Sequence, residues 1–574
     1  MTGFAALARL ARAFCRPMPE WAYWSAFALL LLAGAGLRAY WTATLGVPSL
    51  YPDSVGYAGP AFASPLLPLG EVRTMGTPYL IAASLAVFKH PAGLLIANNL
   101  LWALSTVAAT LALGRVLGLR VLSLVLMAYL AFSYPGLAAE YSLLSDHPAR
   151  IAGLLFFTAL ILASGAPARR RHGALLGLLA ALAILVRPTG VVLVVALCIF
   201  YGWAWLRGER AERPRIAAGA LLGLAIPVLV VWANCAVFKR HYGSFNLTHF
   251  SGLNLFANAG HLVDLDGPAY PEIKRALRMV LPLYVEKYVA RGDHRPNWLT
   301  FGVTDEEMKR DFGNIYPVII INYYAQQYPG ATPKAKSNTV LSELVLEGIR
   351  AHPGAYLERV AGNLGRNLAQ VGHEAWGKPL RPMDLDDHAK QVGMFNNWVR
   401  PDTKSRPNFS HTALGQRVWR GMGEHPYHPA YLEPGQRQRY ANVWAAYDGP
   451  RRGVAAGQAA TPALAALALL AVLLLRRAAP PDGRLVMIAV LGGLIVFGHT
   501  LLHALLNSAD PVRYILPVQD LWVIVVLTLL ALAGHALCGQ RGAITTGSTS
   551  GPAERRVDHR QEPDPVHPQA GGSV

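Results

Sequence analysis

The chain has 574 residues and a net charge of +18, and 53% of its residues are hydrophobic while only 15% are charged. A typical soluble domain has about 25% charged residues. The composition therefore excludes a disordered chain, a collagen and a disulfide scaffold, and it argues against an ordinary soluble enzyme. Basic residues gather at the ends of apolar runs, as in membrane proteins with several spans, so we expect no nucleic-acid partner.

Ten apolar runs predict membrane-spanning helices, although several are shorter than the roughly 20 residues that cross a bilayer untilted. In chain order they are Ala22–Trp41, Pro91–Leu113, Val121–Leu137, Pro148–Ala163, Gly173–Val186, Thr189–Leu206, Ile216–Phe238, Pro462–Leu475, Leu485–Leu506 and Tyr514–Leu537. Ten crossings place every basic cluster in the cytoplasm together with both termini. The apolar segment Thr77–Phe88 is too short to span, and we expect it to lie at the interface or to re-enter.

The predicted fold is an all-α polytopic membrane protein with about ten transmembrane helices and a mixed, mainly helical extracytoplasmic domain. The predicted divisions are a cytoplasmic N-terminus (1–21), an N-terminal transmembrane catalytic module (22–238) with an external loop (42–90), an extracytoplasmic domain (239–461), C-terminal transmembrane helices (462–537) and a disordered cytoplasmic tail (538–574). The expected location is the cytoplasmic (inner or plasma) membrane, with lipids as neighbours and the active site on the extracytoplasmic face.

Polar residues follow the first predicted span on the extracytoplasmic side. Asp53 and Tyr57 are four residues apart, so a short helix after Pro52 would place them on one face. Asp53 is a candidate catalytic carboxylate that accepts or orients the proton of an acceptor hydroxyl, and the alternative is a helix cap. Arg73 is a candidate anion-binding residue, with an interfacial anchor as its alternative.

Two further charges stand beside later spans. Asp146 opens a span, and we treat it as a second candidate catalytic acid, with a helix cap as its alternative and Glu140 as a lower-ranked rival. Arg187 lies between two apolar runs with no other charge nearby. An isolated charge at such a place indicates function, and the planar guanidinium suits a phosphate because it donates two hydrogen bonds at once. Snorkelling toward lipid headgroups is its alternative.

The start of the last span adds two substrate-binding candidates, Arg513 and Tyr514, which are also compatible with an interfacial belt. His499 and His503 are four apart on the preceding run, a spacing that can bind a metal, but no third ligand is evident and two structural histidines are favoured. The sequence predicts no metal site and no certain cofactor, and it leaves a divalent metal as an open alternative. Arginines and acids beside apolar helices together suit a substrate with an anionic phosphate and a long apolar tail.

At these residues the chain resembles the integral-membrane glycosyltransferases of the C-type fold, and more narrowly the branch of bacterial aminoarabinose transferases and protein O-mannosyltransferases. The segments that carry the resemblance are Asp53 with Tyr57, Arg73–Tyr79, Leu144–Asp146, Arg187–Gly190, Ala351–Leu357 and Arg513–Pro517. Relatives often have two adjacent acids in the first loop, whereas here Asp53 is followed by Ser54. The role of a base therefore rests on Asp53 alone.

The resemblance implies transfer of a sugar from a polyprenyl-phosphate donor to a hydroxyl of an envelope lipid, glycan or protein, with inversion at the anomeric carbon. It implies that Arg187, helped by Arg73 and Arg513, stabilises the departing phosphate. Three other functions fit the sequence: a transporter or flippase for a lipid-linked glycan, a ligase or polymerase that uses pyrophosphate-linked oligosaccharides, and a non-catalytic receptor or assembly protein.

Overall fold

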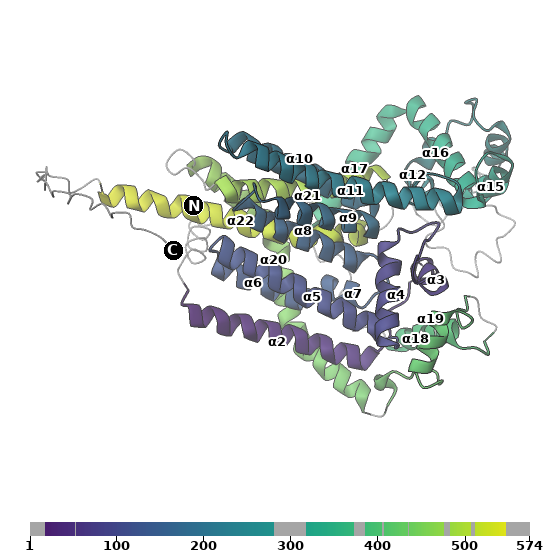
Figure 1. Cartoon of the computed structure of the whole chain (residues 1–574), viewed down its shortest axis with the longest axis horizontal. Coiled ribbons are helices and arrows are strands. Elements are labelled where there is room, and N and C mark those ends of the chain that lie inside the picture. The colour runs from purple at the N-terminus through teal and green to yellow at the C-terminus, as the bar shows by residue number, and fades with distance from the viewer. Residues whose placement is uncertain are drawn as a thin grey trace, which may run out of the picture.

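The computed structural model describes residues 18–51, 53–279, 317–371, 385–403, 407–433, 435–475, 483–506 and 511–546. Their regular structure is helical, and within these ranges the β-structure is a single parallel bridge between Ser49 and Ser142. The predicted all-α polytopic fold is therefore confirmed. Figure 1 shows long helices side by side in a bundle, with shorter helices beyond one end of it.

The bundle consists of α2 (Glu20–Leu45), α5 (Gly93–Leu111) with the π-helical turn η1 (Ala112–Val116), α6 (Arg120–Phe132), α7 (Tyr134–Glu140), α8 (Asp146–Ser164), α9 (Arg170–Val186), the 3-10 turn η2 (Pro188–Gly190), α10 (Val191–Arg207), α11 (Arg213–Tyr242), α20 (Gln436–Leu475), α21 (Gly483–Leu506) and α22 (Pro511–Thr546). The remaining helices are α3 (Ser54–Ala63), α4 (Gly76–Phe88), α12 (Ser251–Ala259), η3 (Gly260–Leu262), α15 (Pro317–Tyr324), η4 (Ala325–Gln327), α16 (Pro333–Ala351), α17 (Pro353–Val371), α18 (Leu385–Val399), α19 (Ala413–Gly421) and η5 (Ala430–Leu432).

The chain is a multi-pass membrane protein. Eight described helices are long and apolar enough to cross a bilayer, and a ninth span results if α6 and α7, which meet at 51°, are counted as one. The remaining predicted run, Gly173–Val186, corresponds to α9, which has 17 residues and packs along α8 and α11. Large apolar side chains are exposed on the outer helices, for example Leu32, Val195 and Leu229, as a lipid-facing surface requires.

One segment is as short as predicted, and another extends beyond its predicted span. The apolar stretch at 77–88 forms α4, whose 13 residues span about 20 Å, less than the roughly 30 Å of a bilayer core. Helix α20 starts at Gln436, well before the apolar run at 462–475 that signals a span. Its first turns are rich in polar residues, so hydropathy alone does not reveal them.

The core of the bundle is apolar. Buried side chains of α8, α9, α10, α21 and α22 form its main cluster, which includes Phe156, Phe157 and Phe200. A second cluster joins α3 and α4 to α18 and α19, and a third joins α12 to α15 and α16. The short helices at the end of the bundle are therefore packed on one another in two groups, and the candidate site lies where the ends of the long helices meet them (Figure 1).

Candidate functional site

A cavity of about 420 Å³ lies at this end of the bundle. Its lining combines the start of α3, the segment before α4, the turn between α9 and α10, and the 245–254 segment, with two residues each from α11 and α21. Four of the predicted site residues line it, namely Asp53, Tyr57, Arg73 and Arg187. Asp146 adjoins the lining residue Ser145 and forms an ion pair with Arg187. Residues far apart in the sequence are thus brought together as one site.

Asp53 and Arg73 form the first ion pair of the cavity, with 2.5 Å between Oδ1 of the acid and a terminal guanidinium nitrogen. Asp53 stands directly before α3, but its side chain accepts no capping hydrogen bond from that helix. Asp53 thus occupies the N-cap position of α3, while its carboxylate is directed to Arg73. The side chains of Arg73 and Asp53 are 16% and 21% exposed, so the pair is largely shielded from water but reaches the cavity.

Aromatic rings hold the guanidinium of Arg73 in place. Its central carbon lies 5.0 Å from the ring centroid of Tyr57 and 4.7 Å from that of Phe250. The Tyr57 hydroxyl is hydrogen-bonded to the Ser145 hydroxyl over 2.8 Å. The buried Nε–H of Arg73 donates to no described atom. A buried donor without an acceptor is costly, so Arg73 has hydrogen-bonding capacity left for an anionic ligand.

Arg187 and Asp146 form the second ion pair, at 3.0 Å. Arg187 ends α9 in an extended conformation, and Pro188 then opens the turn into α10. Asp146 is the first residue of α8, and Ser145 makes no capping hydrogen bond there. The side chain of Arg187 is 11% exposed and that of Asp146 is 3% exposed. The guanidinium of Arg187 is therefore largely buried and directed to Asp146.

The two ion pairs are held in register by direct backbone packing. The Thr74 hydroxyl donates to the Val186 carbonyl over 2.9 Å, which ties the residue after Arg73 to the residue before Arg187. A β-carbon on Gly76 would lie 2.8 Å from the backbone of Leu185 and Val186, so only glycine permits this close approach. The start of α4 and the end of α9 therefore position both arginines together.

The segment that closes the cavity was not predicted from the sequence. Phe250, Ser251 and Asn254 line it, together with Cys235 on α11 and His503 on α21. The rings of His499 and His503 meet edge to face with 4.6 Å between their centroids. Within the described residues no group of three or more His, Cys, Asp or Glu is placed to hold a metal ion. His503 belongs to the lining of the site and was favoured as structural.

Glu71 anchors this closing segment. Its backbone carbonyl accepts from the His249 amide over 2.8 Å, and its carboxylate contacts the imidazole of His249 as well as Thr332 and Lys334. The other ring nitrogen of His249 contacts the Ser244 hydroxyl. One carboxylate thus ties the 244–251 segment and the start of α16 to the loop that carries Arg73.

A second set of charges lies outside the cavity, and of its members sequence reasoning singled out Glu140 alone. Arg38 on α2 makes a two-pronged contact with Glu140 at 2.7 and 2.9 Å. Arg150 on α8 lies 3.5 Å from Glu140 and 2.6 Å from Asp520 on α22. All four side chains are at most 2% exposed. We call Arg38, Glu140, Arg150 and Asp520 the buried network.

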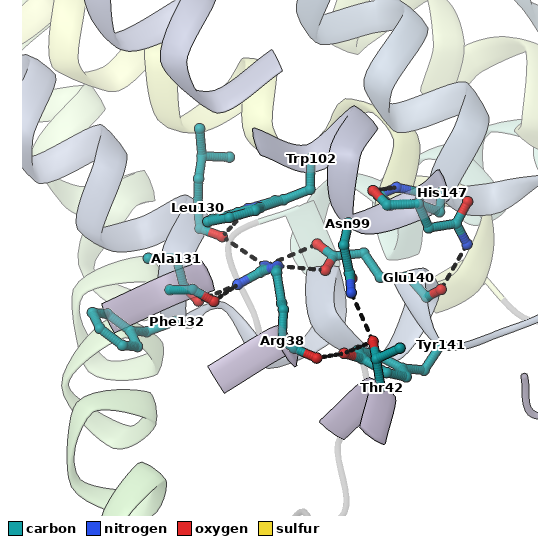
Figure 2. Close-up of polar contacts among 12 residues, drawn as sticks. Arg38, Thr42, Asn99, Trp102, Leu130, Ala131, Phe132, Glu140, Tyr141 and His147 are labelled. Carbon is teal, nitrogen blue, oxygen red and sulfur yellow. Dashed lines mark hydrogen bonds and ion pairs between the residues drawn. The ribbon is translucent and has the colours of Figure 1, made fainter. Parts of the chain in front are cut away.

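Figure 2 shows how completely this network is satisfied around Arg38. The guanidinium also donates to the backbone carbonyls of Gly34, Leu130 and Ala131, and it stacks on Trp102 at 3.6 Å. The network joins α2, α6, α7, α8 and α22, and none of its members lines the cavity. Glu140, the rival acid of Asp146, therefore binds helices together instead of facing a substrate.

The remaining substrate-binding candidates cannot be placed. Arg513 and Tyr514 stand in the first turn of α22, but their side chains fall outside the described residues. The interrupted amphipathic pattern at 342–368 corresponds to α16 and α17, which break at His352. Tyr356 on α17 donates to the Leu505 carbonyl of α21 over 2.8 Å, so the Ala351–Leu357 motif packs on the bundle near the cavity.

Comparison with known proteins gives two similar structures. Archaeal oligosaccharyltransferase AglB from Archaeoglobus fulgidus, in complex with an inhibitory peptide and a dolichol-phosphate, has 12% identity and a TM-score of 0.32, and the match covers 71% of this chain and 60% of that one. The chain thus spans less than two thirds of AglB. ArnT from Cupriavidus metallidurans, bound to undecaprenyl phosphate, has 13% identity and a TM-score of 0.29, with 90% of this chain and 78% of that one covered.

No family model matches the sequence, and no curated protein matches it. Likeness at these TM-scores bears on neither the activity nor the site residues of this chain, and those are argued below from its own geometry.

Proposed function

We propose that this protein is a membrane glycosyltransferase that moves a sugar from a polyprenyl-phosphate carrier to an acceptor hydroxyl on the extracytoplasmic face. One observation carries the proposal: two arginines and two carboxylates from four separate segments converge at one mainly apolar cavity at the end of the helix bundle. Arginines bind phosphate, carboxylates bind or deprotonate hydroxyls, and apolar walls accept a lipid tail.

The donor phosphate lies between Arg187 and Arg73 in this proposal. Arg187 stands at the start of the η2–α10 helical segment, where backbone N–H groups and the helix dipole favour an anion. The unpaired Nε–H of Arg73 supplies a further donor. Val186 and Val231 form apolar parts of the wall, against which the first isoprene units of the carrier pack.

The reaction is a single displacement at the anomeric carbon. The acceptor hydroxyl forms the new C–O bond, the bond from the anomeric carbon to the phosphate oxygen breaks, and the hydroxyl proton passes to Asp53. The polyprenyl phosphate leaves with one more negative charge than it had in the donor. Attack opposite to the leaving group inverts the anomeric configuration.

The change of charge within the cavity during the reaction favours this step. Asp53, Asp146, Arg73 and Arg187 sum to zero net charge before reaction. When Asp53 takes the proton, Arg73 loses its anionic partner while the phosphate gains charge, so Arg73 turns to the leaving group at the moment when charge develops there. Asp146 remains ionised and keeps the guanidinium of Arg187 oriented.

The experiment uses purified protein in lipid discs with a panel of labelled polyprenyl-phosphate sugars and crude envelope extract as acceptor. Loss of labelled donor and release of polyprenyl phosphate are measured for the parent protein, Asp53→Asn and Arg187→Ala. We expect Arg187→Ala to lower the rate by about 10²–10³-fold, as when one charge-stabilising donor is lost, and Asp53→Asn by about 10²–10⁴-fold, as when a general base is lost.

The exposed ion pair between Arg400 and Asp402 supplies matched controls, because it repeats the chemistry outside the cavity. Arg400→Ala and Asp402→Asn should keep the parent rate. Absence of donor consumption by the parent, or equal rates for Arg187→Ala and Arg400→Ala, would overturn the proposal.

A further inference from the structure

A second, smaller cavity lies next to the first. It has a volume of about 200 Å³, below the roughly 300 Å³ at which pockets for drug-sized ligands begin, so it suits a single ring. Its wall is aromatic, with Trp41 from the end of α2, Tyr134 from α7, and Tyr440 and Trp444 from α20. We call it the aromatic pocket.

The rings are held in fixed positions by their mutual packing. Trp41 and Trp444 stack with 5.7 Å between centroids and 14° between planes, and Tyr134 meets the edge of Trp444 at the same distance. Rigid aromatic faces bind ligands that present C–H groups to them at little entropic cost. The apolar face of a pyranose ring is such a ligand.

Polar groups stand at one side of the same pocket. Gln391 and the exposed Asp387, both on α18, line it, and the Gln391 amide donates to the Asp387 carboxylate over 2.9 Å. The Gln391 oxygen accepts from the Leu50 amide, also over 2.9 Å, which fixes α18 against the chain after α2. A carboxylate and an amide beside an aromatic wall are the groups that bind vicinal hydroxyls.

Trp41 carries the observation that points to a ligand. Its side chain is 4% exposed, and its indole N–H has no acceptor among the described residues. Burying a donor without a partner is costly. A hydroxyl or ring oxygen of a bound sugar would satisfy it.

Two chain segments connect the aromatic pocket to the cavity with the ion pairs. Ser49 and Tyr51 line the pocket, and Asp53 lines the cavity two residues later. The neighbouring segment runs parallel, joined by the Ser49–Ser142 bridge, and leads from Tyr141 in the pocket to Ser145 in the cavity. Two residues span at most about 7 Å, so the Tyr51 edge of the pocket lies close to Asp53.

We propose that the aromatic pocket is a carbohydrate-binding subsite that holds one pyranose ring of the acceptor, so that the neighbouring hydroxyl reaches Asp53. The acceptor class is therefore a glycan or glycolipid and not a plain protein side chain. The acceptor assignment rests on the proposed transferase function, whereas binding of a pyranose to the pocket does not.

The test measures binding without turnover. Saturation-transfer-difference NMR and titration calorimetry are applied to the parent protein in lipid discs, with methyl pyranosides of glucose, galactose, mannose and N-acetylglucosamine and their disaccharides, and with sorbitol as a non-cyclic control. We expect at least one pyranoside to bind with saturation of its ring C–H protons, and sorbitol not to bind.

Three variants test the assigned contacts. Trp41→Phe keeps an aromatic ring but loses the indole N–H. Asp387→Asn keeps the shape of the side chain but loses its charge. Each substitution should weaken pyranoside binding by about 3- to 10-fold, as for one lost hydrogen bond. Trp444→Ala removes a face of the wall and should weaken it further. Trp232→Phe, at an exposed position on α11, is the matched control and should bind as the parent does.

The outcomes separate this inference from the proposed function. Binding of no pyranoside, or binding that Trp41→Phe and Asp387→Asn leave unchanged, overturns the pocket assignment even if donor is consumed. Binding with these losses in a protein that consumes no polyprenyl-phosphate sugar supports the pocket and overturns the transferase proposal.

Discussion

The cavity ion pairs and the buried network contain the same chemical groups in opposite settings. In the cavity, each arginine meets one carboxylate and keeps some exposed surface. In the buried network, Glu140 receives two arginines, Arg38 donates to three backbone carbonyls as well, and exposure is at most 2%. Arg73, whose Nε–H donates to no described atom, can exchange its carboxylate for a ligand, whereas the contacts of Arg38 with Glu140 hold helices together.

The first prediction removes the central acid of the buried network. Glu140→Gln leaves two buried guanidinium groups with one carboxylate fewer, and breaking a buried ion pair on one side costs about 3–5 kcal/mol. We expect a large drop in thermal stability in detergent, measured by tryptophan fluorescence, and loss of folded protein in size-exclusion chromatography. Asp53→Asn should keep the parent melting temperature. Equal melting temperatures for Glu140→Gln and the parent would show that the buried network does not stabilise the fold.

The second prediction shifts the cavity arginines without removing them. Gly76→Ala places a β-carbon against the backbone of Leu185 and Val186, so α4 and α9 must separate. Displacement of about 1 Å at a reacting centre can cost 10²-fold in rate, and we expect a loss of this size in donor consumption with the buried network intact. Gly59→Ala on α3, whose β-carbon would meet only Phe409 at 3.9 Å, is the control. Full activity of Gly76→Ala would show that the close packing of α4 against α9 is not needed for donor consumption.

The third prediction separates binding from turnover. Asp146→Asn removes the negative charge beside Arg187, so repulsion of the carrier phosphate falls while the guanidinium loses its orienting partner. We expect tighter binding of polyprenyl phosphate and a turnover number about 10-fold lower. Arg187→Ala should lower both. If Asp146→Asn weakens phosphate binding instead, Asp146 touches the donor in another way.

The fourth prediction has the smallest expected effect and concerns a titratable group outside the spans. Burial lowers the pKa of His388, whose ring contacts the Val47 carbonyl at 3.0 Å and the Tyr431 hydroxyl at 2.9 Å. A histidine that folds in its neutral form supports the fold above its unfolded pKa of about 6.5, and this support is lost as the pH falls below that value. The neighbouring Asp387 opposes the shift.

We expect the melting temperature of the parent to fall between pH 7.5 and pH 5 by more than that of His388→Gln, which cannot titrate at this position. His261 contributes in the same direction, because burial and Arg359 lower its pKa to about 4, so only the difference between parent and variant is informative. If the melting temperatures of the parent and of His388→Gln depend on pH in the same way, protonation of His388 does not destabilise the fold.

The sequence predicts the helical bundle and much of the cavity, because hydropathy and isolated charges are local signals. Asp53, Arg73 and Arg187 stand out as polar residues next to apolar runs, and the structure brings them together. Arg38, Arg150 and Asp520 are also isolated charges in predicted spans, yet only their spatial pairing with Glu140 distinguishes a helix clamp from a site. The 245–254 segment carries no recognisable pattern, so its closure over the cavity depends on long-range contacts such as that of His249 with Glu71.

The most direct test of the central claim is the affinity of the cavity for the phosphate of the carrier. Native mass spectrometry of the protein with undecaprenyl phosphate and with undecaprenol, which has the same tail and no charge, isolates that contribution. We predict that the parent and Arg400→Ala prefer the phosphate, and that Arg187→Ala and Arg73→Ala each lose about 10-fold of this preference, as for one charged hydrogen bond. A parent protein that binds the alcohol as tightly as the phosphate would contradict the account.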